Sequence, residues 1–416
     1  MKKLLVIWFL SFLSAQITGL AEHYEMVPFS SSDSLQRQDR FRINLVAQKG
    51  IYSFNYSGEL VQESISKPAL FWDNREAYIE LAFPLIDIRA GKQKIEWGLI
   101  NGWFLSDRIN PRDMRYHLTR SLNDVRVGIM MVRTRMHLFG FSLEGIWNPK
   151  IEYNPIIDHG PWRERDVDWT NDTPSLFILK DIYDKNLKNE FGLRLAGSVG
   201  RLQYRLMWFD GYQDELWVEY SNINWLTNPD PIGDGEIQSY KMTNRQTFYG
   251  FDCEYPLGSF SLQGEFGYET PFWYNTFPSF VGTGSELHYQ YGMNKSNRSL
   301  SMIGIKYSGL LGLHLNGQWI NKQILDYTTS DKFPATEEYG IFSASGSIPG
   351  LNAGIDYWTL SDLKREGGLS KIELYYLYTQ RIIVTMGIHT VWGNEDHWIG
   401  EFDANDYYFI KGTFIY

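Results

Sequence analysis

The sequence predicts an all-β fold, a single-chain antiparallel transmembrane barrel of 18 strands. Two observations indicate this. Segments of about ten residues that alternate apolar with polar side chains recur along the chain, with Gly, Pro or Ser in many of the turns between them. After Ala21, no stretch approaches the roughly 20 apolar residues that a membrane-spanning helix needs. Because only helices and closed barrels satisfy their backbone in lipid, a membrane protein with this profile must be a barrel.

The N-terminus has the pattern of a secretory signal. Lys2 and Lys3 supply a positive region, Leu4–Leu13 an apolar core, and Gly19-Leu20-Ala21 a small-x-small cleavage site. We therefore expect a signal peptide over residues 1–21 and a barrel over residues 22–416. No cysteine lies near the cleavage point, so we do not expect a lipid-anchored lipoprotein.

Eight hairpins of predicted strands follow, with short turns. The first four pair Phe41–Gln48 with Ile51–Leu60, Glu76–Phe83 with Leu85–Lys94, Asp124–Val132 with His137–Trp147, and Glu190–Val199 with Arg201–Phe209. The other four pair Gln246–Tyr255 with Ser259–Tyr268, Arg298–Tyr307 with Leu311–Asn321, Tyr339–Ser347 with Leu351–Leu360, and Leu369–Tyr378 with Arg381–Val391. A closing strand runs from about Asp406 to Tyr416.

These hairpins and the closing strand give 17 strands, and the direction of the strands requires one more. Short turns normally lie on the periplasmic side of such barrels and long loops outside. The strand at Phe41 ends in the short Lys49-Gly50 turn and so descends, which requires an upward strand before it, between Glu22 and Asp39. We therefore predict 18 strands. The alternation there is poor, so 16 strands, with one of the 17 false, is the alternative.

The segment Ala404–Tyr416 has the alternation of a closing strand. One face carries Tyr408, Ile410, Gly412, Phe414 and Tyr416. A C-terminal strand with a final aromatic residue resembles the signal that the outer-membrane assembly machinery recognises, and we expect that machinery as a partner.

The composition agrees with a membrane barrel. The chain has 15 Trp, 27 Tyr and 25 Phe, residues that barrels place in girdles at both membrane interfaces. The formal net charge is −10, and −12 without Lys2 and Lys3, which argues against nucleic acid as a partner. Cys253 is the only cysteine and shares an apolar face with Phe251 and Tyr255, so we predict a small lipid-facing residue and not a nucleophile.

Alternation also assigns the two faces of the strands. Predicted lipid-facing sets are Ile86/Ile88/Ala90, Val125/Val127/Ile129/Met131, Phe139/Phe141/Leu143, Phe260/Leu262/Phe266/Tyr268, Leu311/Leu313/Leu315/Trp319 and Ile382/Val384/Met386/Ile388. The opposite faces carry charges, and each Arg or Lys would cost about 2–4 kcal/mol at the lipid midplane. We therefore expect a polar lumen, with the candidate pore-lining residues Asp87, Arg89, Gln93, Arg126, Glu144, Arg194, Arg205, Glu254, Glu265, Lys306, His314, Asp356, Glu373 and Lys411.

Within this lumen, the charges are unevenly distributed along the chain. Arginines gather on early strands and carboxylates on later ones, which lie on opposite walls of a barrel. Opposed walls would create a transverse field that orients polar solutes. The alternative is a set of salt bridges that brace the barrel.

Four loops are long: Ile95–Asn123, Pro149–Asn189, Asp210–Arg245 and Thr270–Asn297. We take Pro149–Asn189 as the candidate constriction loop, because it combines prolines with aromatic and charged residues suited to sugars or other polar solutes. The candidate residues are Trp162, Arg163, Arg165 and Trp169. A plain surface loop is the alternative.

No catalytic or metal-binding constellation stands out. The eight histidines are scattered, and no serine lies in a hydrolase signature. The acidic turn Asp230–Asp234-Gly235 has the residue types of a Ca²⁺ site, but its spacing matches no complete one. We therefore expect no enzyme, no metal and no cofactor.

Three segments resemble a known family. Ile88–Asp113 has the form R-x-G-[RK]-Q-x-x-x-W-G followed by N-P-x-D, Asp124–Ile151 resembles a hairpin ending in W-x-P, and Asn189–Asp214 resembles an E-x-G-x-R-L hairpin ending in G-Y-x-D. These are similar to a porin-like family of Gram-negative outer-membrane β-barrels related to the alginate-export barrels. The resemblance implies 16 to 18 strands and a barrel that moves or admits hydrophilic molecules. Alginate itself is not expected, because those pores are strongly basic and the predicted lumen here is balanced.

The sequence thus predicts a protein of the cell outer membrane, in contact with lipid and lipopolysaccharide. We expect a channel for diffusion or export of an unidentified hydrophilic solute. A non-conducting barrel with a structural, adhesion or receptor role is the alternative. Porins are often trimers, whereas the alginate-export barrels are monomers, and we favour a monomer.

Overall fold

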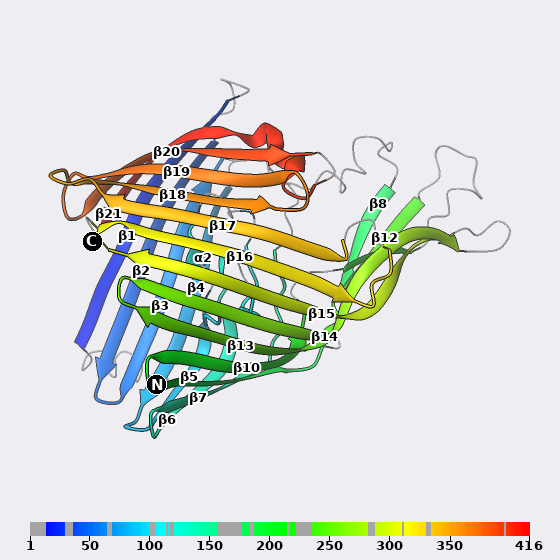
Figure 1. Cartoon of the computed structure of the whole chain (residues 1–416), viewed down its shortest axis with the longest axis horizontal. Helices are drawn as coiled ribbons and strands as arrows, with labels where there is room; N and C mark the ends of the chain where they lie inside the picture. Colours follow the sequence, from blue (N-terminus) through cyan, green and yellow to red (C-terminus); the bar gives the residue numbers. More distant parts are fainter. Residues whose placement is uncertain are drawn as a thin grey trace, which may run out of the picture.

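The computed structural model describes residues 14–29, 36–64, 69–99, 105–113, 115, 120–155, 177–183, 187–213, 217–221, 235–281, 288–309, 312–329, 334–394 and 397–416. They form an antiparallel barrel of 18 strands, which closes because the first strand pairs with both the second and the last (Figure 1). No helix among these residues is long and apolar enough to cross a membrane.

The barrel strands of the first half are β1 (Ser14–Pro28), β2 (Gln36–Lys49), β3 (Tyr52–Glu63), β4 (Ala69–Ala82), β5 (Ile86–Gln93), β6 (Ile129–Leu138), β7 (Phe141–Asn148), β9 (Glu190–Val199) and β10 (Leu202–Tyr212). Those of the second half are β13 (Arg245–Leu257), β14 (Phe260–Val281), β15 (His288–Ser308), β16 (His314–Leu325), β17 (Thr336–Ser347), β18 (Ala353–Asp362), β19 (Gly367–Leu377), β20 (Ile382–Gly393) and β21 (Tyr407–Ile415).

Short turns gather at one end of the barrel and longer connections at the other. Gly200 and Gly258 take positive φ angles of 59° and 63° in the β9–β10 and β13–β14 turns, a conformation that favours glycine. Figure 1 shows the tight hairpins of the second half at the left, with the C-terminus. Two longer connections contain helical turns, α2 (Leu122–Val125) and η4 (Gly400–Asn405).

A second sheet lies at the end with the long connections. It has the strand order β11 (Trp217–Ser221), β12 (Gly235–Met242) and β8 (Phe177–Tyr183), with β8 parallel to β12. Figure 1 shows β8 and β12 at the right, beside the far ends of the long strands β14 and β15. These strands lie within the predicted loops Pro149–Asn189 and Asp210–Arg245, so these segments are not loops throughout.

Side chains alternate between an apolar outer face and an inner face. On β14 and β15, Leu262, Phe266 and Ile303 point outward with 46%, 48% and 67% of their surface exposed, whereas Glu265 and Met302 between them are buried inside. Apolar side chains exposed in this way recur around the barrel and form a belt suited to lipid.

The prediction of 18 strands is confirmed, and seven of the eight predicted hairpins are present where they were predicted. The predicted upward strand before Phe41 is β1, which begins earlier than expected, at Ser14. Residues 14–21 of the predicted signal peptide therefore pair with β2 in this structure of the whole chain. Removal of residues 1–21 stays a prediction.

The predicted β6–β7 hairpin has the wrong position. The expected strand Asp124–Val132 is replaced by α2 at Leu122–Val125 and by β6, which begins at Ile129 and turns at Phe139-Gly140. Ile129 and Met131 were expected to face lipid, but they are 1% and 2% exposed and belong to a buried cluster inside the barrel.

Candidate functional site: a loop inside the barrel

We call the connection between β5 and β6, residues 94–128, the inner loop, and its described residues contact the inner faces of widely separated strands. Its described residues bind side chains of β3, β7 and β14. Since β3 and β14 lie far apart in the strand order, a segment that reaches both must cross the barrel interior.

Asn110 joins the two ends of the inner loop, where it leaves β5 and where it enters β6. Its side-chain oxygen accepts a hydrogen bond from the Ile95 amide at 2.8 Å, and its side-chain nitrogen donates to the carbonyls of Val127 (2.8 Å) and Gln93 (3.3 Å). Gln93 in turn donates to the Met131 carbonyl at 3.1 Å. Asn110, the first residue of the N-P-x-D motif, therefore holds the two ends of the inner loop together.

Trp97 connects the inner loop to β6, β7 and β9. Its indole nitrogen donates to Glu144, a carboxylate that is 1% exposed, at 3.0 Å. The same carboxylate accepts from Arg133 at 2.7 Å and lies 2.8 Å from Arg135 and 3.0 Å from Arg194. The Arg194 guanidinium also lies over the Trp97 ring, 5.6 Å from its centre. One buried carboxylate thus joins three arginines to the loop.

The far side of the inner loop is fixed to β14. Both carboxylate oxygens of Glu265 accept backbone hydrogen bonds from the loop, from Leu99 and Ser106, each at 2.9 Å. Arg108 forms an ion pair with the buried Glu269 of the same strand at 2.5 Å. These contacts hold the loop against β14, on one side of the barrel.

The second anchor is a basic cluster, defined as Arg40, Arg42, Arg75, Lys94 and Arg120. Asp124 of α2 lies 3.3, 2.9 and 3.2 Å from the first three of these side chains. The fully buried Glu59 of β3 lies 2.6 Å from Arg42 and 3.4 Å from Arg120. None of these basic residues is among the predicted pore-lining set, although Arg40 and Arg42 lie two apart on one strand and so share a face.

Three ionisable groups of the inner loop, outside the strands, have shifted pKa values. Burial, followed by the neighbouring Arg75, lowers the pKa of Lys94 to about 7. Burial acts to raise the pKa of Asp124, but the arginines of the basic cluster outweigh it and the pKa falls below its usual range. Burial raises the pKa of Asp107 despite its ion pair with Arg126.

The predicted pore-lining arginines lie in ion pairs. Arg89 binds Glu80 at 2.8 Å, Arg205 binds Asp252 at 2.5 Å, and Arg194 binds Glu144 as described above. Arg126 lies on the inner loop and not on a strand, where it donates to Asp107 at 2.6 Å. These local pairs favour the bracing alternative over a transverse field between opposite walls.

The remaining predicted residues are spread over the inner wall. Asp87 lies 3.3 Å from His137, Glu254 accepts from Ser261 at 2.7 Å, His314 lies 3.0 Å from Ser308, and Glu373 lies 2.6 Å from Lys371. Alternation places Lys306, Asp356 and Lys411 on the inner faces of β15, β18 and β21. The structure brings Gln93, Arg126, Glu144, Arg194 and Glu265 together around the inner loop. Their pore-lining role stays a prediction.

The predicted constriction residues Trp162, Arg163, Arg165 and Trp169, and the acidic turn at Asp230–Asp234, lie outside the described residues. Among the residues that are described, no group of His, Cys, Asp and Glu is arranged to hold a metal ion. The described segment that enters the barrel from the predicted long loops is the one between β5 and β6.

A second inward connection joins β20 to β21 and includes η4. Ile399 is 2% exposed and packs in the same apolar cluster as Ile95, Trp97 and Ile109 of the inner loop. Trp398 donates to the Tyr339 hydroxyl at 3.2 Å, and His397 lies 3.0 Å from Asp362. Apolar residues of two connections and of many strands therefore fill part of the interior.

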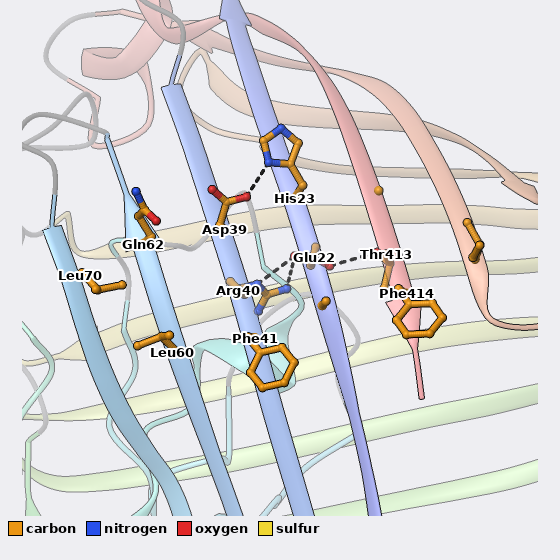
Figure 2. Close-up of a pocket in the computed structure, with 13 residues that line it drawn as sticks. Glu22, His23, Asp39, Arg40, Phe41, Leu60, Gln62, Leu70, Thr413 and Phe414 are labelled. Atoms are coloured by element: carbon orange, nitrogen blue, oxygen red, sulfur yellow. Dashed lines mark hydrogen bonds and ion pairs between the residues drawn. The ribbon is translucent and has the colours of Figure 1, made fainter.

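A groove of about 530 Å³ opens on the outer surface, over β20, β21 and β1 to β4. Its walls are mainly apolar, and Phe41, Leu60, Leu70 and Phe414 are exposed on the outer face. Figure 2 shows these side chains beside the Glu22–Arg40 pair, which joins β1 to β2. Since its apolar walls belong to the outer belt, the groove faces lipid and lies apart from the inner loop.

The sequence matches no protein-family model and no curated protein. Among solved structures, it is similar to OccK5 (OpdH) of Pseudomonas aeruginosa, with 9% identity, 97% of each chain covered and a TM-score of 0.52. It is also similar to OccAB3 of Acinetobacter baumannii, with 8% identity, 98% of this chain and 99% of that chain covered, and a TM-score of 0.51.

The chain has the fold of an outer-membrane porin. Closure of the sheet leaves no unpaired edge, and the apolar belt supplies the surface that such a barrel presents to lipid. The protein is an outer-membrane barrel.

Proposed function

We propose that this porin-like barrel is a channel for hydrophilic solutes, narrowed by the inner loop. The observation that supports this most is the way the loop is held. Its contacts with Glu144, Glu265 and the basic cluster are polar and charged, so ionisable groups gather where the loop crosses the barrel interior, as they do at the constrictions of selective channels. Charged walls around a crossing loop provide a selective constriction. We propose no catalytic role.

The alternative is a non-conducting barrel with a structural, adhesion or receptor role. The apolar cluster favours it, because Trp97, Ile109 and Ile399 pack with residues from many strands and exclude water from part of the interior. A relationship to the alginate-export barrels remains a proposal, which rests on the three segments Ile88–Asp113, Asp124–Ile151 and Asn189–Asp214. Four further statements are also proposals from the sequence: contact with lipopolysaccharide, delivery by the assembly machinery, a monomeric state and the absence of nucleic-acid partners.

The deciding experiment is single-channel recording of the protein purified in folded form from outer membranes and inserted in planar bilayers in KCl. Discrete conductance steps support the channel. A silent bilayer, with a barrel shown to be folded by circular dichroism, supports the non-conducting alternative. Reversal potentials in a KCl gradient then report the sign of the charge at the constriction.

A further inference from the structure

Three amide side chains form a group on the inner wall across β14, β15 and β16. Gln263 of β14 and Gln318 of β16 are both in register with Gly304 of β15. Asn316 lies on the same face of β16 as Gln318, two residues away. We call Gln263, Asn316 and Gln318 the amide patch. Gly304 has no side chain, and Gln318 packs over it, with its Cγ 3.0 Å from the position that a Cβ of Gly304 would take.

The amide patch is buried and unpartnered. The three residues are 3%, 5% and 5% exposed. The nitrogen and the oxygen of each amide lack a hydrogen-bond partner in the part of the chain that the structure describes. A buried polar group left without a partner costs about 1–3 kcal/mol, so six such atoms on one wall are a large cost unless a bound molecule satisfies them.

The chemistry of the amides restricts that molecule. Each amide has an oxygen that only accepts and an NH₂ group that only donates. A carboxylate would satisfy the three donors and leave the three acceptors facing negative charge, and an ammonium group would do the reverse. Hydroxyl groups both donate and accept, so a neutral solute with several hydroxyls satisfies the whole patch.

An aromatic side chain lies on the same wall. Asn316 is in register with Ser343 of β17, which is in register with Trp358 of β18. Trp358 is on the inner face, and its indole nitrogen also lacks a partner among the described residues. An indole offers a flat apolar surface and one donor, which suits the C–H face and a hydroxyl of a sugar ring.

We propose that the amide patch, with Trp358 beside it, is a binding subsite for neutral hydroxyl-rich solutes such as sugars. This rests on the proposed channel and adds the class of solute that it selects. The subsite lies on the wall of β14 to β18, whereas the strand residues of the basic cluster lie on β2 and β4, so the two parts of the interior differ in chemistry.

The test is a saturation-transfer NMR titration of trehalose with the folded wild-type protein in detergent micelles, with succinate as the charged probe. We expect saturable binding of trehalose and no saturable binding of succinate. In the double variant Gln263→Met/Gln318→Met, the Kd for trehalose should rise about tenfold or more, because at least two hydrogen bonds are lost. Gln323→Met makes the same chemical change on the outer face of β16 and should leave the Kd unchanged.

A second measurement separates binding from folding. If the amides serve a ligand, replacing them with methionine removes unsatisfied groups and should raise the thermal unfolding midpoint in the absence of sugar. A lower midpoint together with an unchanged Kd would overturn the proposal, as would a wild-type protein that conducts KCl but does not bind trehalose. In that last case the channel stands and the subsite is rejected, whereas trehalose binding to a silent barrel rejects the channel and keeps the subsite.

Discussion

Substitution of Glu265 is the most direct test of whether the inner loop constricts the channel. It lies on β14, is 3% exposed, and accepts one backbone hydrogen bond on each carboxylate oxygen, from Leu99 and Ser106. The substitution Glu265→Gln keeps the size of the side chain. It replaces one accepting oxygen with an NH₂ group that faces a backbone N–H, so one of the two hydrogen bonds cannot form.

The expected magnitude follows from that count. A hydrogen bond to a charged group contributes about 1.5–3 kcal/mol, and the remaining bond changes from charged to neutral. A loss of about 1.5–3 kcal/mol shifts the equilibrium between the docked and the released loop by about 10- to 150-fold toward release. A channel that is narrowed by the docked loop should therefore open more often or to a larger conductance.

Single-channel recording in planar bilayers measures this directly. We expect Glu265→Gln to show larger steps or longer open times than the wild type, or to conduct where the wild type is silent. Glu254→Gln is the matched control, since Glu254 lies on the adjacent strand β13 and accepts from Ser261, away from the loop. Unchanged conductance and open times in a folded Glu265→Gln protein would refute the role of the loop as a constriction.

Three further perturbations test the inner loop and its charges. Asp124→Asn removes the carboxylate shared by the basic cluster, so anion preference should rise, read as a shift of the reversal potential in a KCl gradient. Gly98→Ala should lower the free energy of unfolding in urea by about 1–3 kcal/mol, because Gly98 has a φ of 94° and a Cβ there would lie 2.9 Å from a Glu265 oxygen. The control Gly317→Ala should leave it unchanged, because a Cβ there has no atom within 4 Å. Lys94, with a pKa of about 7, is charged below that pH and neutral above it, so anion preference should fall between pH 6 and 8 and become independent of pH in Lys94→Met.

The strands could be predicted because their signal is local. Alternation with a period of two residues and Gly-containing turns locate a hairpin such as β13–β14 without knowledge of the rest of the chain. The direction of the strands then required one more strand near the N-terminus, and β1 supplies it. For the same reason, the outward positions of Leu262 and Phe266 follow from the sequence.

The contents of the barrel could not be predicted in this way. The contact between Leu99 and Glu265 joins residues 166 positions apart, and no local pattern encodes it. Ile129 and Met131 alternate as lipid-facing residues do, but they pack against the inner loop, so an apolar face does not by itself indicate lipid when a loop fills the interior. The basic cluster could not be predicted, because its residues come from β2, β4 and the loop and are brought together only by folding.

Asn110 has a consequence for the way the interior could open. By binding Ile95 and Val127 it divides one long excursion into two lobes that share a root, which also reduces the entropy lost in ordering them. The first lobe, before Asn110, is held by Glu144 and Glu265, and the second, after it, by the basic cluster. The two lobes are also joined to each other, because Arg126 of the second lobe forms ion pairs with Asp107 and Glu96 of the first. The inner loop is therefore one braced unit, and release of either lobe from its wall also requires breaking ion pairs within the loop.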